Sequence, residues 1–270
     1  MPSQPIKLSL ILVLLLNINT SNAEQLSGEA EFRAALETRK TITPLIESYF
    51  SSNEKKQRPS QNTIEEQGER AAALLKQYNT QIKDSANLGF APAQFTYALT
   101  LKSQATTASS EKSALQAEAC DLLNRAVERG LLAAALGRGL YCSGLSLRSN
   151  DEMIAKQTKK IAHELTYAIT ITDPYINYYP FQAMQPLNCF ERQESNSGSD
   201  ATLWQKIIQN QHPLITYEQT KAEVYYQLAY TSEPGEETQA KNYLDQAEAL
   251  GCMAERVATI RTFLDRRATK

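Results

Sequence analysis

The residues that most enzyme active sites need are scarce in this sequence. It has two histidines, His163 and His212. The Glu164 beside His163 points about 100° away around a helix, so the two side chains form no dyad. The spacings of zinc-peptidase, serine-hydrolase, dinucleotide-binding and P-loop motifs are all missing. The 30 acidic residues have no spacing that singles out a catalytic pair. We therefore expect a protein that is not an enzyme and that needs no cofactor or metal.

The sequence also lacks an excess of basic charge. Lys and Arg total 28 against 30 Asp and Glu, and the net charge is −2. A nucleic-acid-binding protein usually carries a basic excess or a clustered basic face. The longest basic groupings, Lys159-Lys160 and Arg266-Arg267, are of the kind found on any solvated helix surface. Nucleic acid is therefore not an expected partner.

A short apolar run near the start of the chain predicts export. Lys7 precedes the run Leu8–Leu16, and a polar stretch follows that ends in Ser21-Asn22-Ala23. This order of a basic residue, an apolar run and small residues is typical of a secretory signal, here residues 1–23. The run has about nine residues, whereas about 20 are needed to cross a bilayer. We expect cleavage after Ala23, a periplasmic or secreted location and no stable membrane anchor.

Export gives the cysteines a structural meaning. The four cysteines are Cys120, Cys142, Cys189 and Cys252, and no two of them have the CxxC spacing of redox or zinc sites. In an oxidising compartment an even number predicts two disulfides, for which three connectivities are possible. Cys120 and Cys142 lie about ten residues to either side of a turn, at similar heights on two antiparallel helices. Geometry thus favours Cys120–Cys142, with Cys189–Cys252 following by elimination.

The apolar periodicity predicts an all-α fold, because no segment alternates as a strand does. After the signal, residues 24–110 read as an N-terminal helical region that contains a first repeat and ends in a polar linker at 103–111. Residues 111–172 read as a central helical repeat region, and 173–200 as a Pro- and Tyr-rich loop. Residues 201–270 read as a C-terminal helical repeat region.

Three segments of the chain superpose on their glycines: Ile82–Gly89, Leu123–Gly130 and Leu244–Gly251. Each has an apolar residue seven positions before the glycine and a small residue four positions before it. A glycine at this place ends a helix in the left-handed conformation. Small residues follow in each second helix, where they let helix axes approach closely.

These segments resemble the Sel-one-like repeat, a relative of the tetratricopeptide repeat. The family's pattern of A-A-x-x-G, A-Q, L-G and Y-x-x-G is carried by Ala126 and Gly130, Ala93-Gln94, Leu136-Gly137 and Tyr141–Gly144. The middle copy differs by one residue in spacing, and the last copy lacks the L-G and Y-x-x-G part. The resemblance implies an α-solenoid of antiparallel helical hairpins that binds other proteins on a concave face.

The aromatic residues of the loop are the candidate binding site: Tyr175, Tyr178, Tyr179 and Phe181. Such rings can stack on a sugar or anchor a protein partner. Alternatively, they form a lid over the core that Cys189 holds down. We expect an exported protein–protein interaction or scaffolding module of the cell envelope, whose protein partner the sequence does not identify. The alternative is a glycan-binding protein or envelope hydrolase that uses residues 173–194.

Overall fold

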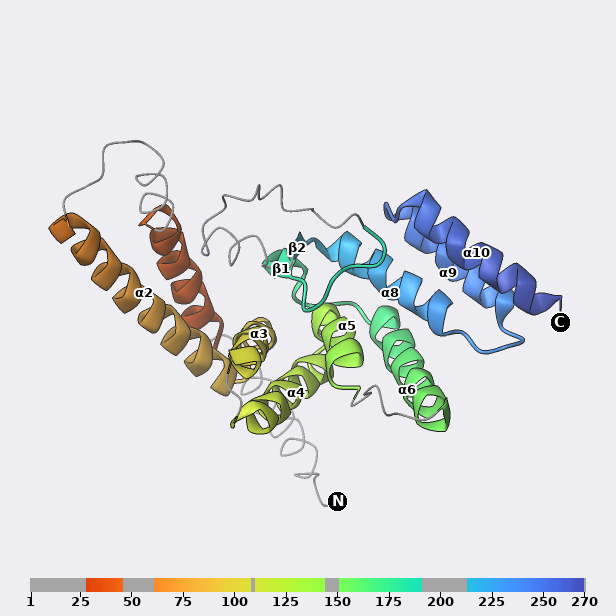
Figure 1. Ribbon diagram of the computed structural model, residues 1–270, viewed down its shortest axis with the longest axis horizontal. Helices are drawn as coiled ribbons and strands as arrows, with labels where there is room; N and C mark the ends of the chain where they lie inside the picture. The colour runs from red at the N-terminus through yellow and green to blue at the C-terminus, as the bar shows by residue number, and fades with distance from the viewer. Residues whose placement is uncertain (1–27, 46–60, 108–109, 144–150, 191–212, 270) are drawn as a thin grey trace, which may run out of the picture. The chain divides into compact units, whose positions relative to one another are not determined.

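The computed structural model describes residues 28–45, 61–107, 110–143, 151–190 and 213–269. The described residues form nine α-helices, which pack as sequential antiparallel pairs (Figure 1). The first helix spans residues 28–45, and the others are α2 (Gln61–Asn87), α3 (Ala91–Thr107), α4 (Lys112–Glu128), α5 (Leu132–Tyr141), α6 (Asp151–Thr170), α8 (Tyr217–Thr231), α9 (Glu237–Ala249) and α10 (Ala254–Ala268). The expectation of a helical fold of antiparallel pairs is confirmed. The expected signal at 1–23 and the expected helix at 201–211 lie outside the described residues.

The chain divides into two compact units, and the division falls between Tyr97 and Ala98, inside α3. In the first unit, the helix at 28–45 lies alongside α2 (Figure 1). Phe32 packs against Phe90 with 5.4 Å between ring centroids, and the Thr38 hydroxyl bonds the side chain of Gln81. This unit buries Phe32, Ile82 and Phe90 almost completely. It therefore has a core of its own.

Among the described residues of the second unit, α8 contributes to two apolar clusters. The first lies between α5, α6 and α8, and its buried members are Leu132, Ala135, Leu136, Ile161, Leu165, Ala168, Val224 and Leu228. The second joins α8, α9 and α10 and includes both Cys189 and Cys252. Because α8 packs on several sides, most of its residues are buried, including the polar Thr220, Glu223 and Gln227.

The three glycine turns found in the sequence have one geometry. Gly89, Gly130 and Gly251 have φ values of 91°, 89° and 94°. After each glycine, the next N–H donates to the carbonyl five residues earlier, in the pairs Phe90–Ser85, Leu131–Ala126 and Cys252–Ala247. This bond satisfies a carbonyl at the helix end that would otherwise lack a partner. The small residue four positions before each glycine is fully buried, which explains the sequence pattern.

Both favoured disulfides are present. Cys120 and Cys142 join the middle of α4 to the end of α5, with their Cα atoms 5.7 Å apart. Cys189 and Cys252 join the loop after α6 to the turn before α10, with 4.8 Å between Cα atoms. The pairing Cys120–Cys142 is confirmed for the reason given by the sequence, because the two helices do run antiparallel from the Gly130 turn.

Two local expectations are wrong. The polar stretch at 103–107 continues α3 as helix, because Ala105 is buried and holds that turn against the core. A short antiparallel ladder also pairs β1 (Phe181–Gln182) with β2 (Leu214–Ile215), although no strand was expected. Each strand has two residues, which is too short for an alternating pattern to be visible in the sequence.

Candidate functional site

Residues 173–190, here called the strap, are fixed to the helices at several points. The first point is Asp173, which is buried. One of its carboxylate oxygens accepts from the Leu132 N–H at 2.9 Å and from the Tyr179 hydroxyl at 2.8 Å. The other accepts from the N–H of Tyr175 at 2.7 Å. The residue before α5 is Leu131, which has no side chain able to cap a helix, so Asp173 supplies the cap from a distance of 41 residues.

The middle of the strap is held by α3 and by the β ladder. The Lys102 ammonium donates to the carbonyl of Met184, and it also lies 5.5 Å from the centre of the Tyr141 ring. Burial lowers the pKa of Lys102. Past β1, the N–H of Ala183 donates to the Pro213 carbonyl at 2.8 Å. These bonds fix the backbone of the strap between its two ends.

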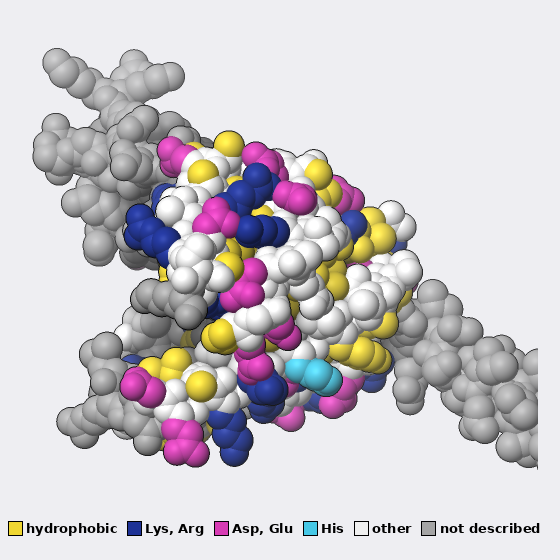
Figure 2. All heavy atoms as spheres, turned by 90° about the vertical axis from the view of Figure 1, so that its right-hand side faces the viewer, with side chains coloured by type: hydrophobic (Ala, Val, Ile, Leu, Met, Phe, Trp, Pro, Cys, Tyr) yellow, Lys and Arg dark blue, Asp and Glu magenta, His cyan; other side chains and the backbone are white. Residues whose placement is uncertain are grey.

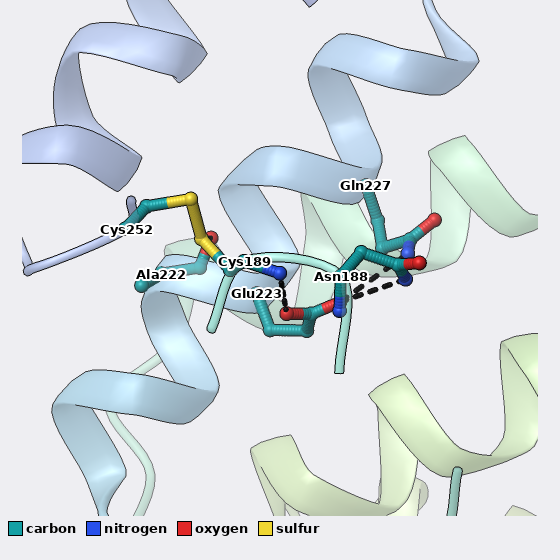
Figure 3. Close-up of a disulfide and its surroundings, with 6 residues drawn as sticks. All are labelled: Asn188, Cys189, Ala222, Glu223, Gln227 and Cys252. Carbon is teal, nitrogen blue, oxygen red and sulfur yellow. Dashed lines mark hydrogen bonds between the residues drawn. A yellow bond between two sulfur atoms is a disulfide. The ribbon is translucent and has the colours of Figure 1, made fainter. Parts of the chain in front are cut away.

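The far end of the strap is held by Glu223 of α8 beside a disulfide (Figure 3). One oxygen of Glu223 accepts from the backbone N–H and the side-chain amide of Asn188 at 2.9 and 3.0 Å. The other oxygen accepts from the Cys189 N–H at 2.9 Å. Cys189 in turn bonds Cys252 covalently and accepts from the N–H of Met253 at the start of α10. A carboxylate that is 1% exposed is tolerated here because several amides solvate it.

The four aromatic residues expected at a binding site lie mostly inside this assembly. Tyr175 and Phe181 are 3% and 5% exposed, and Tyr178 and Tyr179 are half-buried. The Tyr179 ring contacts Phe181 edge-on, with 4.7 Å between centroids. The Tyr179 hydroxyl accepts from the Ala133 N–H as well as donating to Asp173. These contacts favour the interpretation of the strap rings as a lid on the core.

A second group of aromatic residues remains half-exposed beside the strap. We call it the tyrosine surface and define it by Tyr217, Lys221 and Tyr225 of α8 together with Tyr243 of α9. The three α8 residues are spaced four apart and so lie on one face of the helix. All three tyrosines pack on the apolar cluster between α5, α6 and α8. The surface therefore rests on a rigid core rather than on a loop.

The contacts within the tyrosine surface join its members in two pairs on the same face. The rings of Tyr225 and Tyr243 are stacked, with centroids 6.1 Å apart and 26° between planes. Lys221 places its ammonium 5.5 Å from the centre of the Tyr217 ring, and Tyr217 meets Tyr179 of the strap edge-on at 5.4 Å. Strap and surface are thus in direct contact.

The phenol groups of Tyr217 and Tyr225 keep their protons and offer free hydrogen-bonding capacity. Burial, with the charges of Asp173 and Glu218 next in effect, raises the pKa of Tyr217. Burial and the neighbouring Tyr243 raise the pKa of Tyr225. The Tyr243 hydroxyl accepts from Gln239 at 2.7 Å. Within the described ranges, no hydrogen bond reaches the hydroxyl of Tyr217 or Tyr225. Two neutral phenols are therefore available as both donors and acceptors.

The residues of the tyrosine surface were not among those expected at a site. Its signal was the spacing of Tyr217, Lys221 and Tyr225 in the segment YEQTKAEVY. That spacing was masked because the other sides of α8 are buried and carry polar residues, so the helix has no clear contrast between an apolar and a polar face. Asp173 and Glu223 were missed because nothing in a sequence relates an acid to amides that lie 41 or 35 residues away.

Charges elsewhere on the second unit are largely paired with one another. Figure 2 shows basic and acidic side chains interleaved on the side of the molecule where α9 and α10 lie. Ion pairs link α9 to α10: Lys241–Asp265, Arg261–Asp245, Arg261–Glu248 and Arg267–Glu237. Among the described residues, no group of three or more His, Cys, Asp and Glu side chains is placed to hold a metal ion.

In the part of the chain that the structure describes, no helix combines the length and the apolar run that a bilayer crossing requires. No protein-family model, curated protein or solved structure matches the chain. The function is therefore argued from the geometry of the chain itself.

Proposed function

We propose that this chain is an exported protein-interaction module of the cell envelope, and that a protein partner binds the tyrosine surface. The observation that carries the proposal is the half-exposed group of Tyr217, Tyr225 and Tyr243 on a fixed core, with two hydroxyls unbonded among the described residues. Tyrosine offers a large contact area and a polar group at little entropic cost, and so it is frequent among the residues that dominate binding energy.

We further propose that the helices form an α-solenoid, and the repeated turn geometry supports this. Three turns with equal glycine conformations and equal hydrogen bonds, each followed by a small-residue-rich helix, are what Sel-one-like or tetratricopeptide-like repeats would produce. Two disulfides support an oxidising compartment, in keeping with a periplasmic or secreted protein that has lost residues 1–23. We place the partner-binding face on the helices and not on the strap.

The alternative of a glycan-binding protein or envelope hydrolase gains little from the described part of the strap. A hydrolase needs a carboxyl group that reaches its substrate. Asp173 is buried, and both of its oxygens accept hydrogen bonds from the protein. The rings of Tyr175 and Phe181 offer almost no accessible face for a sugar. A sugar that stacks on Tyr217 or Tyr225 instead is an outcome that the following experiment detects.

Site-specific photo-crosslinking tests the proposal. Benzoylphenylalanine replaces Tyr225 in one version of the exported, oxidised full chain and Tyr230 in another. Tyr230 is also on α8 and is 61% exposed, but it lies five residues further and so about 140° around the helix. We expect a discrete crosslinked protein from position 225 and none from position 230, and mass spectrometry identifies it.

Binding of the identified partner then gives a quantitative check. The Tyr217→Ala/Tyr225→Ala double variant should weaken binding at least about tenfold, as expected when aromatic contact residues are removed. Tyr230→Ala should leave affinity within about twofold of the native chain. Equal crosslinking from both positions would contradict the proposal. Absence of any protein adduct, together with protection of Tyr217 or Tyr225 by oligosaccharides, would favour the glycan-binding alternative.

A further inference from the structure

Tyr179 joins the strap to the tyrosine surface. Its hydroxyl donates to Asp173 at 2.8 Å and accepts from the N–H of Ala133 at 3.1 Å. Its ring touches Tyr217 edge-on. Asp173, Ala133 and Tyr217 belong to three different parts of the fold, namely the strap, the start of α5 and the start of α8.

The hydroxyl of Tyr179 is held in one orientation. The same Asp173 oxygen that accepts from Tyr179 also accepts from Leu132 at the start of α5. Leu132 and Ala133 therefore direct successive N–H groups at Asp173 and Tyr179, and the ring cannot rotate out without leaving both an N–H and a carboxylate oxygen short of a partner. Burial, followed by the charge and hydrogen bond of Asp173, raises the pKa of Tyr179, so the hydroxyl stays a donor.

Tyr217, the residue that Tyr179 touches, is itself fixed at its backbone. It is the first residue of α8, which begins with a capping box formed by Thr216 and Gln219. Its backbone is thus set by the cap, while its side chain is bounded by the ring of Tyr179 on one side and by Lys221 on the other. The orientation of the Tyr217 ring depends on the position of Tyr179.

We infer that Tyr179 is a positioning residue for the tyrosine surface: through its bonds to Asp173 and α5 it holds the Tyr217 ring in the orientation that a protein partner binds. The inference rests on the proposed function for its binding part. It assigns to the strap an indirect role, since the strap does not contact the partner and instead sets the shape of the surface that does. Tyr179 was expected from the sequence to bind a partner, and here its role is to position Tyr217 instead.

The Tyr179→Phe variant tests the inference, because it removes one oxygen and keeps the ring. A partner-independent readout is nitration by tetranitromethane, which attacks the ionised phenol and is quantified at each tyrosine by peptide mapping. We expect the ratio of nitration at Tyr217 to that at Tyr225 to rise at least threefold, since the freed ring of Tyr179 no longer fixes its neighbour. The Tyr230→Phe variant serves as the matched control and should leave the ratio unchanged.

The second readout is crosslinking from position 225, which should fall at least threefold in the Tyr179→Phe chain. An unchanged nitration ratio would overturn the inference whatever crosslinking shows. A raised ratio with full crosslinking would overturn the link between positioning and binding. If the native chain itself yields no crosslink, the proposed function fails, and the nitration ratio still decides whether Tyr179 positions Tyr217.

Loss of folding is separated from loss of positioning in two ways. Peptide mapping of each variant must recover both disulfides, Cys120–Cys142 and Cys189–Cys252, before its nitration is measured. A second variant, Asp173→Asn, keeps the size of the side chain and leaves Tyr179 intact, but it changes the group that fixes the hydroxyl. It should raise the same nitration ratio by a smaller factor, and an unchanged ratio in both folded variants would contradict the inference.

Discussion

Gly130 and Gly251 occupy equivalent turns, with φ values of 89° and 94°, yet their surroundings differ in one respect. A Cβ added to Gly130 would lie 3.2 Å from the Cδ atom of Pro174 in the strap, whereas one added to Gly251 would meet nothing within 4 Å. The two turns have the same backbone requirement, and only the first is covered. They form a natural pair for separating backbone strain from steric contact.

Replacing each of these glycines with alanine should destabilise the protein to different extents. Gly251→Ala introduces only the left-handed strain of an L-residue and should cost about 1 kcal/mol of unfolding free energy. Gly130→Ala adds the close contact with Pro174, and we expect a cost at least about 1 kcal/mol greater. Urea denaturation of the oxidised chain measures both values. Equal losses would show that the strap moves freely away from the turn.

Glu223→Gln should destabilise the second unit although it changes the side chain by one group. Each oxygen of Glu223 accepts from N–H groups of Asn188 or Cys189, so an NH₂ placed at either position faces a donor. We expect a loss of about 2 kcal/mol in unfolding free energy. The control is Glu218→Gln, an exposed carboxylate on the same helix, for which the loss should stay below about 0.5 kcal/mol. If Glu223→Gln loses no more stability than Glu218→Gln, Glu223 does not hold the end of the strap in the way described.

Stability should fall at alkaline pH, and Tyr179 should account for part of the fall. The pKa of Tyr179 is raised in the folded protein by burial and by Asp173. Above about pH 10, the tyrosines of the unfolded chain lose protons while folded Tyr179 keeps its own. The folded state then binds more protons, so the unfolding free energy declines as the pH rises, by about 1.4 kcal/mol per pH unit for each such group.

The Tyr179→Phe variant should therefore show a shallower decline above pH 10, by up to about 1.4 kcal/mol per pH unit. The measurement is a series of denaturation curves between pH 8 and pH 11, extrapolated to water. Phe181→Leu is a suitable control, because it removes a neighbouring ring without removing a proton. It should lower stability about equally at every pH. Parallel curves for Tyr179→Phe and the native chain would rule out this contribution.

The two disulfides should differ in their effect on stability. The Cys189–Cys252 bond joins residues separated by 63 positions and the Cys120–Cys142 bond joins residues separated by 22. In the chain-entropy model, closing these loops contributes about 4 and about 3 kcal/mol respectively. Paired Cys→Ser variants should lose about these amounts in denaturation experiments. Peptide mapping under non-reducing conditions checks the pairing, and a Cys120–Cys189 or Cys120–Cys252 peptide would contradict it.

Those parts of the fold that depend on neighbours in sequence could be predicted. Gly130 ends α4 because glycine alone enters the left-handed region cheaply. The pairing of Cys120 with Cys142 followed from helix geometry and the position of one turn. In each case the physical cause acts within about three helical turns of the residue that shows it.

The site could not be predicted in the same way, because its causes are distant in sequence. The sequence left open whether the rings of Tyr175 and Phe181 bind a partner or form a lid on the core. Their burial depends on Asp173 bonding α5 and on Glu223 bonding the end of the strap. The polar stretch at 103–107 was read as a linker from weak helix formers, and the burial of Ala105 overrides that preference. Tyr217 and Tyr225 are candidate binding residues because the elements around them leave them partly exposed. No local sequence pattern indicates that exposure.

The disulfide of the strap also determines how the chain responds to force. Pulling on the two ends of the oxidised protein cannot extend the residues between Cys189 and Cys252, which are separated by 63 positions. At roughly 3.4 Å per extended residue, that loop withholds about 200 Å of contour length until the bond is reduced. In an optical trap the oxidised chain should therefore unfold over a much shorter distance than the reduced one. The part of the chain between Cys189 and Cys252, which contains α8 and α9, would add almost no length to the stretched oxidised protein.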